Sequence, residues 1–521
     1  MKVHKPALPA VHDSVVAMLD DTVNEFPGRV ALQMGEAQMT YDELRNAVVG
    51  MAGMLRKAGS EGGRVATVLP NSLLACIAPY AIGAAGAQHV PLNPQYTARE
   101  LHYMLKDAAP RLLIVDDALA SKVQTLALEM PQCRVILETE INAWLATWRL
   151  QPTQHGLAPL CPASGQLAIL QYTGGSSGFS KGVNLTHLSI STNISQREGL
   201  LPVGREGERV ICVMPLFHSY AMAMGLFLCG YSGSTLVVLP GYHPDRLIEA
   251  ITRQRITIFP GSPTIFTGLL DAPAFAASDW SRVHTCYSGS AALSAETLAR
   301  WEAATHAPIY EGYGQTEAGP VLTFNAIAGP VKVGSVGIPV AATEIQVVDL
   351  ETGLKVLPCG QKGEIRARGP QLMKGYHNLP VETDEALRDG WLYTGDIGEF
   401  DEDGCLFIRD RKKDMVIVGG YNVYPREVEE VLFTHPAIVD AAVVGHPDSY
   451  RGEALRAFVV VRQGMNVDTD ELLEFCRTSL ARYKLPSRID RVESLPKTSV
   501  NKTDKKALKL RVLGELNRPG I

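Results

Sequence analysis

A run of small and hydroxylated residues that ends in a lysine has the clearest chemical capacity in this 521-residue chain. It reads Tyr172-Thr173-Gly174-Gly175-Ser176-Ser177-Gly178-Phe179-Ser180-Lys181-Gly182. Its glycines let the backbone approach a ligand closely, its Thr and Ser side chains add hydroxyl donors, and Lys181 adds a mobile positive charge. These groups predict a cradle for a phosphate chain, and we expect a nucleotide polyphosphate as the ligand.

Two other loop motifs share part of this pattern and predict different chemistry. A Walker A loop needs Ser or Thr directly after its lysine, whereas Gly182 and Val183 follow Lys181. Residues 174–178 do match the G-x-S-x-G pattern of a hydrolase nucleophile, so a serine hydrolase is the alternative from another reaction class. A hydrolase does not account for the motifs that follow.

Five further polar motifs follow the loop along the chain. They are Phe217-His218-Ser219, Tyr313-Gly314-Gln315-Thr316-Glu317, Tyr393-Thr394-Gly395-Asp396, Arg409-Asp410-Arg411-Lys412-Lys413-Asp414 and Pro496-Lys497-Thr498-Ser499-Val500-Asn501-Lys502. In order and spacing, the six motifs resemble those of the adenylate-forming superfamily, which contains acyl-CoA synthetases, the adenylation domains of peptide synthetases and firefly luciferase. The resemblance extends from about residue 40 to the last lysine cluster and implies an enzyme that activates a carboxylic acid with ATP.

The chemistry of carboxylate activation explains why such residue types recur. A carboxylate is a poor acyl donor because its leaving group would be an oxide. Attack of its oxygen on the α-phosphorus of ATP expels pyrophosphate and gives an acyl-adenylate, whose leaving group is AMP. Two anions must approach each other in this step, so cations and aligned hydrogen-bond donors are required.

The resemblance implies which residues bind the phosphates and the metal. The expected contacts to the β- and γ-phosphates come from Thr173, Gly174, Ser176, Ser177, Gly178 and Lys181. Glu317, with Thr316 beside it, is the expected Mg²⁺ site, and Thr173 is a second candidate ligand. A helix-capping carboxylate is the alternative role of Glu317.

The resemblance also implies the contacts to the nucleoside. Tyr313, flanked by Gly312 and Gly314, is expected to stack on adenine, with the segment Gly289-Ser290-Ala291 on the other side. An ordinary core tyrosine is the alternative. Asp396 would accept hydrogen bonds from both ribose hydroxyls, and Arg411 would reach the ribose or phosphate edge.

Lys502 corresponds to the adenylation lysine of the family, which bridges the incoming carboxylate and the α-phosphate. Asn501 stands where the family has glycine, and asparagine tolerates left-handed backbone better than most residues. The nearby Lys505, Lys506 and Lys509 are expected on a solvated helical face.

Transfer of the acyl group is the second step that the resemblance implies. Lys413 stands at the expected hinge, and rotation about it would withdraw Lys502 and bring Gly419, Gly420 and Asn422 toward the site for CoA. We therefore predict an acyl-CoA synthetase with ATP, Mg²⁺ and CoA. The alternative is a fatty-acyl-AMP ligase or aryl-acid adenylating enzyme that passes the acyl group to a carrier protein or CoA.

The expected acyl tunnel is formed by residues 215–225, with His218 at its mouth. Methionines and small residues in this stretch give an adaptable apolar channel. Neither this stretch nor residues 288–293 contain lysine or arginine, so a second carboxylate would lack a partner. A medium- or long-chain fatty acid is the first prediction and an aryl acid the second. A satisfied core histidine is the alternative for His218.

The elements that carry these motifs predict an α/β fold. Apolar runs such as 65–69 and 111–115 indicate buried strands that alternate with helices at 41–57 and 98–107. We expect an N-terminal domain (1–410) with two αβ-layered subdomains (about 1–165 and 166–330) and a small β-barrel (331–410). A hinged, smaller α+β C-terminal domain (411–521) follows.

Composition excludes several other classes of protein. The net charge is −6 and the basic residues are dispersed, which argues against a nucleic-acid partner. Nine cysteines form no C-x-x-C pair, so neither a disulfide framework nor a zinc site is indicated. The first residues lack the apolar segment of a secretory signal, and the apolar stretch 73–90 predicts a buried helix, not a membrane span. A cytoplasmic enzyme is expected, and a homodimer is compatible with these properties.

Overall fold

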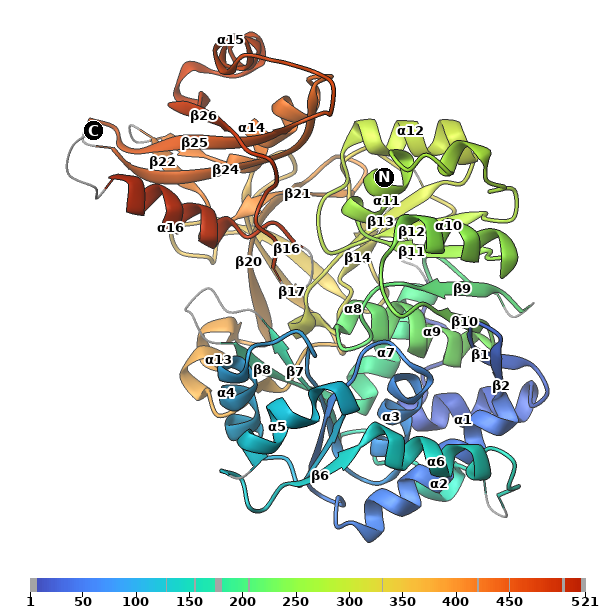
Figure 1. Cartoon of the computed structure of the whole chain (residues 1–521). Coiled ribbons are helices and arrows are strands. Elements are labelled where there is room, and N and C mark those ends of the chain that lie inside the picture. The colour runs from blue at the N-terminus through green and yellow to red at the C-terminus, as the bar shows by residue number, and fades with distance from the viewer. Residues whose placement is uncertain are drawn as a thin grey trace.

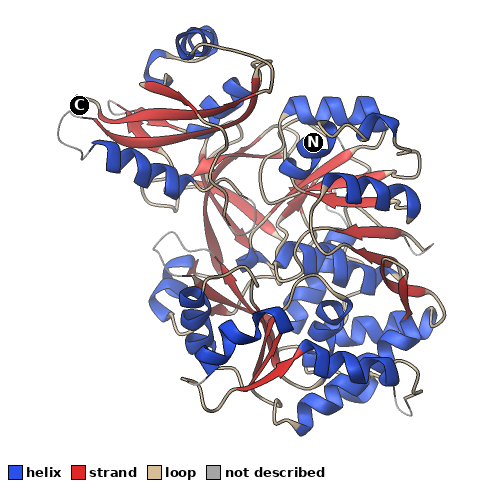
Figure 2. Cartoon of the chain, in the orientation of Figure 1, coloured by secondary structure: helices blue, strands red, loops and turns tan. Residues whose placement is uncertain are grey.

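The computed structural model describes residues 7–127, 129–153, 156–173, 180–204, 207–329, 331–418, 421–448, 450–498 and 502–516. Figure 1 shows a large N-terminal body and a smaller C-terminal body, drawn in orange and red, with β20 and β21 between them. Figure 2 shows helices packed against the strands of both bodies. This arrangement confirms the predicted α/β class, with a large N-terminal and a smaller C-terminal part.

The first sheet has seven strands in the order β18-β8-β7-β4-β3-β5-β6. Its strands are β3 (Arg64–Val68), β4 (Gln88–Pro91), β5 (Leu112–Val115), β6 (Arg134–Leu137), β7 (Leu167–Thr173), β8 (Lys181–Thr186) and β18 (Gly375–Tyr376). The pairs from β7 to β6 are parallel, whereas β8 is antiparallel to both β7 and β18. The associated helices are α2 (Tyr41–Lys57), α3 (Leu73–Ala84), α4 (Ala98–Ala108), α5 (Ala120–Ala127), α6 (Glu138–Trp148) and α7 (His187–Glu198), with 3₁₀ turns at Asp117–Leu119 and Ala158–Leu160.

The second sheet has nine strands in the order β15-β14-β13-β12-β11-β9-β10-β1-β2. Its strands are β1 (Val30–Met34), β2 (Ala37–Thr40), β9 (Arg209–Cys212), β10 (Thr235–Val238), β11 (Ile258–Gly261), β12 (Thr285–Ser288), β13 (Ile309–Tyr313), β14 (Thr323–Phe324) and β15 (Ile338–Pro339). The helices are α1 (Val15–Glu25), α8 (Ser219–Ala221), a π-helix (Met222–Phe227), α9 (Leu228–Ser232), α10 (Pro244–Arg253), α11 (Pro263–Leu270) and α12 (Ala295–Thr305), with 3₁₀ turns at Phe275–Ala277 and Thr316–Ala318.

Two antiparallel-rich sheets complete the chain. The third sheet has the order β16-β17-β20-β19, with β21 also paired to β20, and the fourth has the order β23-β22-β25-β24, with β26 paired to β25. The third contains β16 (Glu344–Val348), β17 (Gly363–Arg368), β19 (Leu387–Arg388), β20 (Trp391–Phe400), β21 (Leu406–Arg411) and helix α13 (Pro380–Ala386). The fourth contains β22 (Val416–Val418), β23 (Tyr421–Val423), β24 (Ile438–Asp448), β25 (Gly452–Val461), β26 (Arg488–Arg491), helices α14 (Pro425–Phe433), α15 (Thr469–Ser479) and α16 (Lys505–Leu516), and a 3₁₀ turn at Arg482–Lys484.

Local signals account for many of these elements. Helix α2 begins where Thr40 and Glu43 form a reciprocal capping box, which satisfies two backbone donors at the helix start. Helix α3 is almost wholly buried, as expected for an apolar stretch, but it ends at Ala84 and the chain continues as strand β4. Among the described helices, none has both the length and the apolar character needed to cross a bilayer.

The predicted subdomains are consecutive stretches of the chain, but two of the sheets contain strands from more than one of these stretches. Strand β1 from the start of the chain pairs in parallel with β10, so Leu32 lies beside Leu236 in the second sheet. Strand β18, from the segment expected in the barrel, joins the first sheet through β8. The barrel segment itself forms an antiparallel sheet, and the pairings among its described strands leave it open. Long-range pairing decides these assignments, and local pattern does not encode it.

The C-terminal body is joined to the N-terminal body by ion pairs. Glu427 on α14 accepts hydrogen bonds from Lys362, which precedes β17, and from Lys484. Arg462 lies 3.6 Å from a carboxylate oxygen of Asp271 and 3.6 Å from one of Glu296. These contacts hold the segment that carries Lys502 against the larger body.

Candidate active site

Asp396 lies at the centre of a small polar cluster where β13, β20 and β21 meet. The phenol of Tyr313 donates a 2.7 Å hydrogen bond to one carboxylate oxygen of Asp396, and Arg411 Nε lies 3.1 Å from the other. The antiparallel register of β20 and β21 sets Asp396 directly opposite Arg411. The predicted nucleoside residues Tyr313, Asp396 and Arg411 are therefore brought together, although up to 98 positions separate them in the chain.

The electrostatics of this cluster follow from burial and from the ion pair. Asp396 is 4% exposed, and its negative charge raises the pKa of Arg411 above its usual value. Burial, followed by the charge of Asp396, raises the pKa of Tyr313. The tyrosine therefore stays a neutral hydrogen-bond donor to Asp396.

Glycine is required at two positions beside Tyr313. A Cβ atom on Gly314 would lie 2.0 Å from the carbonyl oxygen of Pro320, and one on Gly312 would lie 2.4 Å from the ring of Phe324. The chain can therefore turn tightly from β13 into the 3₁₀ turn that carries Thr316 and Glu317. Thr316 is buried, and its hydroxyl lies 3.2 Å from that of Ser219 at the start of α8.

Glu317 has only neutral hydrogen-bond donors close to it. The hydroxyl of Tyr376 donates to Glu317 Oε1 at 2.9 Å, and burial raises the pKa of the carboxyl. Among the described residues, no lysine or arginine nitrogen lies within 4.0 Å of this carboxylate. A half-buried carboxylate without an ion-pair partner among the described residues fits a divalent cation that takes its other ligands from phosphate and water. No cluster of three or more His, Cys, Asp or Glu side chains occurs in the described parts of the chain.

The two ends of the phosphate loop lie on paired strands. Thr173 ends β7, Lys181 begins β8, and the hydroxyl of Thr173 donates to the carbonyl of Lys181 at 3.4 Å. The ammonium of Lys181 lies 4.8 Å from the centroid of the Tyr376 ring. The loop residues between them, including the predicted Gly174, Ser176, Ser177 and Gly178, lie outside the described residues.

His218 and Lys502 approach each other from opposite bodies of the protein. His218 caps α8 by accepting a hydrogen bond from the backbone N–H of Tyr220 at 3.2 Å. Burial, and then the charge of Lys502, lowers the pKa of His218 to about 3. Burial, and then the charge of Arg411, lowers the pKa of Lys502 to about 8, while Asp396 acts in the opposite direction. The charge of Lys502 therefore interacts with the nucleoside cluster and with His218 at the start of the expected acyl tunnel.

Backbone hydrogen bonds on either side of residues 499–501 fix the segment that carries Lys502. The N–H of Thr498 donates to the carbonyl of Lys502 at 2.7 Å, and the N–H of Lys502 donates to Thr498 Oγ1 at 3.2 Å. Asn501 itself lies outside the described residues.

Residues 289–291 follow β12 with a strained backbone. A Cβ atom on Gly289 would lie 2.8 Å from the ring of Tyr220, and Ser290 has a positive φ of 74°. Ala291 is exposed. Gly289 therefore allows a close approach of the backbone to Tyr220, and the predicted adenine contact of this segment stays a prediction.

Several predicted residues lie elsewhere or play other roles. Asn422 is exposed on β23, where the neighbouring Tyr421 stacks on Tyr483, and Gly419 and Gly420 lie outside the described residues. Lys413 is exposed between β21 and β22. The expectation of a solvated face for the lysines after residue 502 is wrong in part, because Lys505 forms a 2.7 Å ion pair with Glu429.

An apolar cavity adjoins α8 and the π-helix. Its volume is about 10 Å³, and Met222 and Ala223, from the stretch predicted to form the acyl tunnel, line it together with Phe227. Gln171 on β7 also lines it, and among the residues that the structure describes its Oε1 atom has no hydrogen-bond partner. Neither Gln171 nor Tyr376 was predicted as a site residue. Gln171 lies one residue before the first quoted motif, but Tyr376 has no spacing signal and depends on the pairing of β18 with β8.

Comparison with known proteins identifies the class of protein that this fold and site define. The AMP-binding enzyme family matches residues 19–377, and the AMP-binding enzyme C-terminal domain matches residues 427–502. The chain therefore belongs to the AMP-binding enzyme family.

Relatives with curated names extend over nearly the whole chain. A long-chain-fatty-acid-CoA ligase of Bacillus subtilis (strain 168) is 38% identical over 526 residues, covering 95% of this chain and 94% of the relative. A feruloyl-CoA synthase of an Amycolatopsis species is 35% identical over 482 residues, covering 91% of this chain and 94% of the relative. The predicted class of enzyme, an acyl-CoA synthetase, is confirmed, and ATP and CoA fit this class as substrates.

A solved structure is similar across both bodies of the protein. The crystal structure of ATP-bound MatB from Rhodopseudomonas palustris has a TM-score of 0.89 at 29% identity, covering 97% of this chain and 100% of that chain. The apo structure of the same protein has a TM-score of 0.79. The arrangement of this chain is therefore more similar to the ATP-bound form.

Proposed function

We propose that this enzyme activates a medium- or long-chain fatty acid as its acyl-adenylate and then transfers the acyl group to CoA. The observation that carries the proposal is the cluster of Tyr313, Asp396 and Arg411, whose charges act on the ammonium of Lys502. A half-buried ammonium that interacts with a nucleoside cluster suits a reaction in which a carboxylate approaches a phosphate.

In the first step, a carboxylate oxygen of the acid forms a bond to the α-phosphorus of ATP. The bond from that phosphorus to the bridging oxygen of pyrophosphate breaks, so that acyl-adenylate and pyrophosphate are formed. Lys502 offsets the negative charge that gathers between the two anions. His218 has a pKa of about 3, so it is neutral at pH 7 and adds no charge to the acyl entrance.

We assign the nucleotide contacts to the residues that the polar cluster brings together. Asp396 accepts from the ribose, Arg411 holds the ribose or phosphate edge, and Tyr313 stacks on adenine. Glu317 is the proposed metal ligand, with Thr173 as a second candidate. Mg²⁺ bound there would neutralise charge on the phosphate chain. Lys181 would contact the leaving pyrophosphate.

In the second step, the thiol of CoA attacks the carbonyl carbon of the adenylate. A carbon–sulfur bond forms, the carbon–oxygen bond to AMP breaks, and the thiol proton is released. We infer that rotation near Lys413 removes Lys502 from the site before this step and brings the segment with Asn422 toward it. The exposure of Lys413 between β21 and β22 supports a hinge at this point.

The fatty-acid substrate class rests on the apolar side of the site. The small cavity, of about 10 Å³, is lined by Ile169, Leu185 and Ile190 as well as by the π-helix, and among the described residues no charged side chain lines it. This volume suits about one water molecule, so the apolar character of the lining, and not its size, supports the substrate class. The relative from Bacillus subtilis bears the name of a long-chain-fatty-acid-CoA ligase, which agrees with this chemistry. An aryl acid is the second candidate, supported by the relative named feruloyl-CoA synthase.

A panel of acids tests the proposal. We expect acyl-CoA, identified by mass, from saturated fatty acids with ATP, Mg²⁺ and CoA, and little product from cinnamic-type acids or dicarboxylates. Pyrophosphate release should depend on CoA for repeated turnover. Release of about one equivalent per enzyme, unchanged by CoA, would show that the acyl acceptor is a different thiol.

A further inference from the structure

Tyr376 contacts two groups of the proposed site that come from separate elements. Its hydroxyl donates to Glu317 Oε1 at 2.9 Å, and its ring lies beneath the ammonium of Lys181, 4.8 Å from the centroid. Glu317 follows β13, whereas Lys181 begins β8. We propose that Tyr376 is a positioning residue. It holds the metal-ligand carboxylate of Glu317 and the phosphate-binding ammonium of Lys181 at fixed positions relative to each other. This inference rests on the roles proposed above for those two residues.

The backbone around Tyr376 is tied to both of these elements. The N–H of Met373 donates to the carbonyl of Glu317 at 2.9 Å, and the N–H of His377 donates to the carbonyl of Gly182 at 2.7 Å. Between these bonds, strand β18 pairs with β8, with Tyr376 opposite Val183. The segment 373–377 therefore joins the turn that carries Glu317 to the strand that begins with Lys181.

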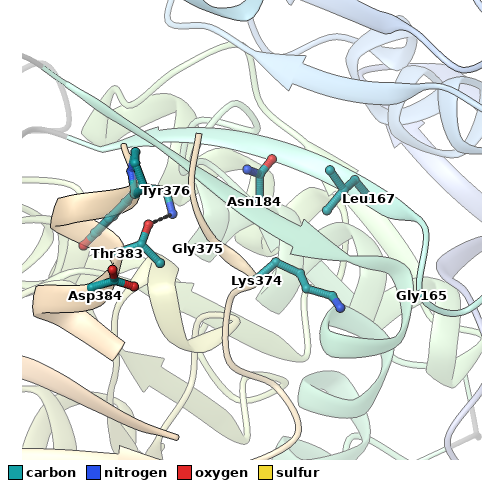
Figure 3. Close-up of a pocket in the computed structure, with 9 residues that line it drawn as sticks. Gly165, Leu167, Asn184, Lys374, Gly375, Tyr376, Thr383 and Asp384 are labelled. Atoms are coloured by element: carbon teal, nitrogen blue, oxygen red, sulfur yellow. Dashed lines mark hydrogen bonds between the residues drawn. The ribbon is translucent and has the colours of Figure 1, made fainter. Parts of the chain in front are cut away.

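Helix α13 fixes Tyr376 from its other side. Figure 3 shows the N–H of Tyr376 bonded to the hydroxyl of Thr383 on α13, at 2.9 Å. That hydroxyl in turn donates to the carbonyl of Leu379 at 2.7 Å. Tyr376 also lines an open groove of about 410 Å³ with Lys374 and Asp384. Because the backbone is held on both sides, the direction of the hydroxyl is set before any ligand binds.

The hydroxyl of Tyr376 donates to one oxygen of Glu317, Oε1. A hydroxyl donor on Oε1 limits rotation of the carboxylate and directs its second oxygen toward a cation. The ring acts separately, because a cation over an aromatic face needs the ring and not the hydroxyl. The two functions can therefore be separated by substitution.

Binding of Mn²⁺, used as a paramagnetic substitute for Mg²⁺, tests the proposal without turnover. Free Mn²⁺ is measured by electron paramagnetic resonance in the presence of the enzyme and a non-hydrolysable ATP analogue. For Tyr376→Phe we expect about 10-fold weaker Mn²⁺ binding, the usual effect of losing an outer-shell partner. Binding of the analogue without metal should not change. For Tyr376→Leu both should weaken, the analogue by about 3-fold.

The Mg²⁺ dependence of pyrophosphate release gives a second test, because a residue with a purely structural role would not change it. In Tyr376→Phe, the Mg²⁺ concentration for half-maximal pyrophosphate release should rise about 10-fold. The rate at saturating Mg²⁺ should stay within about 3-fold of the original. Formation of acyl-CoA from supplied acyl-adenylate and CoA, which needs neither ATP nor its metal, should be unchanged.

Two controls separate the failure of this inference from failure of the proposed function. Tyr231→Phe removes a partly exposed hydroxyl that donates to Ala10 at 3.2 Å, remote in sequence from the site, and should leave both assays unchanged. Glu317→Gln should abolish the tight Mn²⁺ site.

If Glu317→Gln weakens Mn²⁺ binding but Tyr376→Phe does not, Tyr376 has no positioning role. If neither variant changes Mn²⁺ binding, the metal role of Glu317 is itself refuted. Equal loss of both half-reactions in Tyr376→Phe, with a lowered melting temperature, would also refute the inference.

Discussion

The charge state of Lys502 should set the alkaline limit of adenylation. Its pKa of about 8 means that about nine-tenths of the free enzyme carries the ammonium at pH 7 and about one-tenth at pH 9. Because kcat/KM reports ionisations of the free enzyme, kcat/KM for the acid should fall about 10-fold between these pH values. Lys502→Ala should reduce adenylation by about 10²- to 10³-fold, the usual effect of removing one preorganised charge-stabilising group.

The assay should isolate the first half-reaction, since the thiol of CoA also titrates in this range. Pyrophosphate release is followed with hydroxylamine as the acyl acceptor, from pH 6 to 9.5. Lys502→Arg keeps its charge throughout and should lose the alkaline limb, although its absolute rate falls. In Lys502→Ala, reaction of supplied acyl-adenylate with CoA should largely persist. An alkaline limb that remains in Lys502→Arg would refute the assignment of this ionisation to Lys502.

Three further substitutions give distinct expected outcomes. Asp396→Asn removes the ion pair with Arg411 and should raise the KM for ATP about 10-fold in steady-state kinetics, whereas an unchanged KM would contradict the ribose role. Burial raises the pKa of Glu311 from 4.5 to about 7, so between these pH values the folded state retains a proton that the unfolded state releases. The free energy of unfolding therefore falls as the pH rises from about 4.5 to about 7. Glu311→Gln should therefore be more stable than the original protein at pH 8, by about 3 kcal/mol, but not at pH 4, in urea unfolding. Gly314→Ala sets a Cβ atom 2.0 Å from the carbonyl oxygen of Pro320 and should cost about 2 kcal/mol in the same assay, with loss of adenylation.

Local sequence signals are sufficient to predict the bounds of elements whose ends are defined by residues close to them in the chain. The capping residues Thr40 and Glu43 start helix α2, and the predicted helix 41–57 has the bounds Tyr41–Lys57. Helix α4, predicted at 98–107, likewise spans Ala98–Ala108 and begins at a capping box of Thr97 and Glu100. In both cases the information lies within a few residues of the element.

Long-range contacts were the part that the sequence did not reveal. Strand β1 pairs with β10 about 200 positions later, and nothing near Leu32 indicates its partner Leu236. Tyr376 was missed for the same reason, because its contact with Glu317 depends on the pairing of a two-residue strand. Lys505 was expected in solvent because its partner Glu429 lies on another helix, α14.

The phosphate loop with Lys181 was predicted from its local pattern, whereas the residues of the nucleoside cluster came from the family resemblance. Tyr313, Asp396 and Arg411 are separated in sequence, and only the known order of motifs suggested that they meet. The structure brings these three together with Lys502. Their catalytic roles remain predictions that the substitutions above can test.

The most direct test of the central claim follows an oxygen atom from the acid into AMP. A fatty acid labelled with ¹⁸O in both carboxylate oxygens is converted with ATP, Mg²⁺ and CoA, and the AMP is analysed by mass spectrometry. Attack of the carboxylate on the α-phosphorus, followed by cleavage of the carbon–oxygen bond, predicts one ¹⁸O atom in each AMP. Unlabelled AMP, or label in inorganic phosphate, would contradict an acyl-adenylate intermediate.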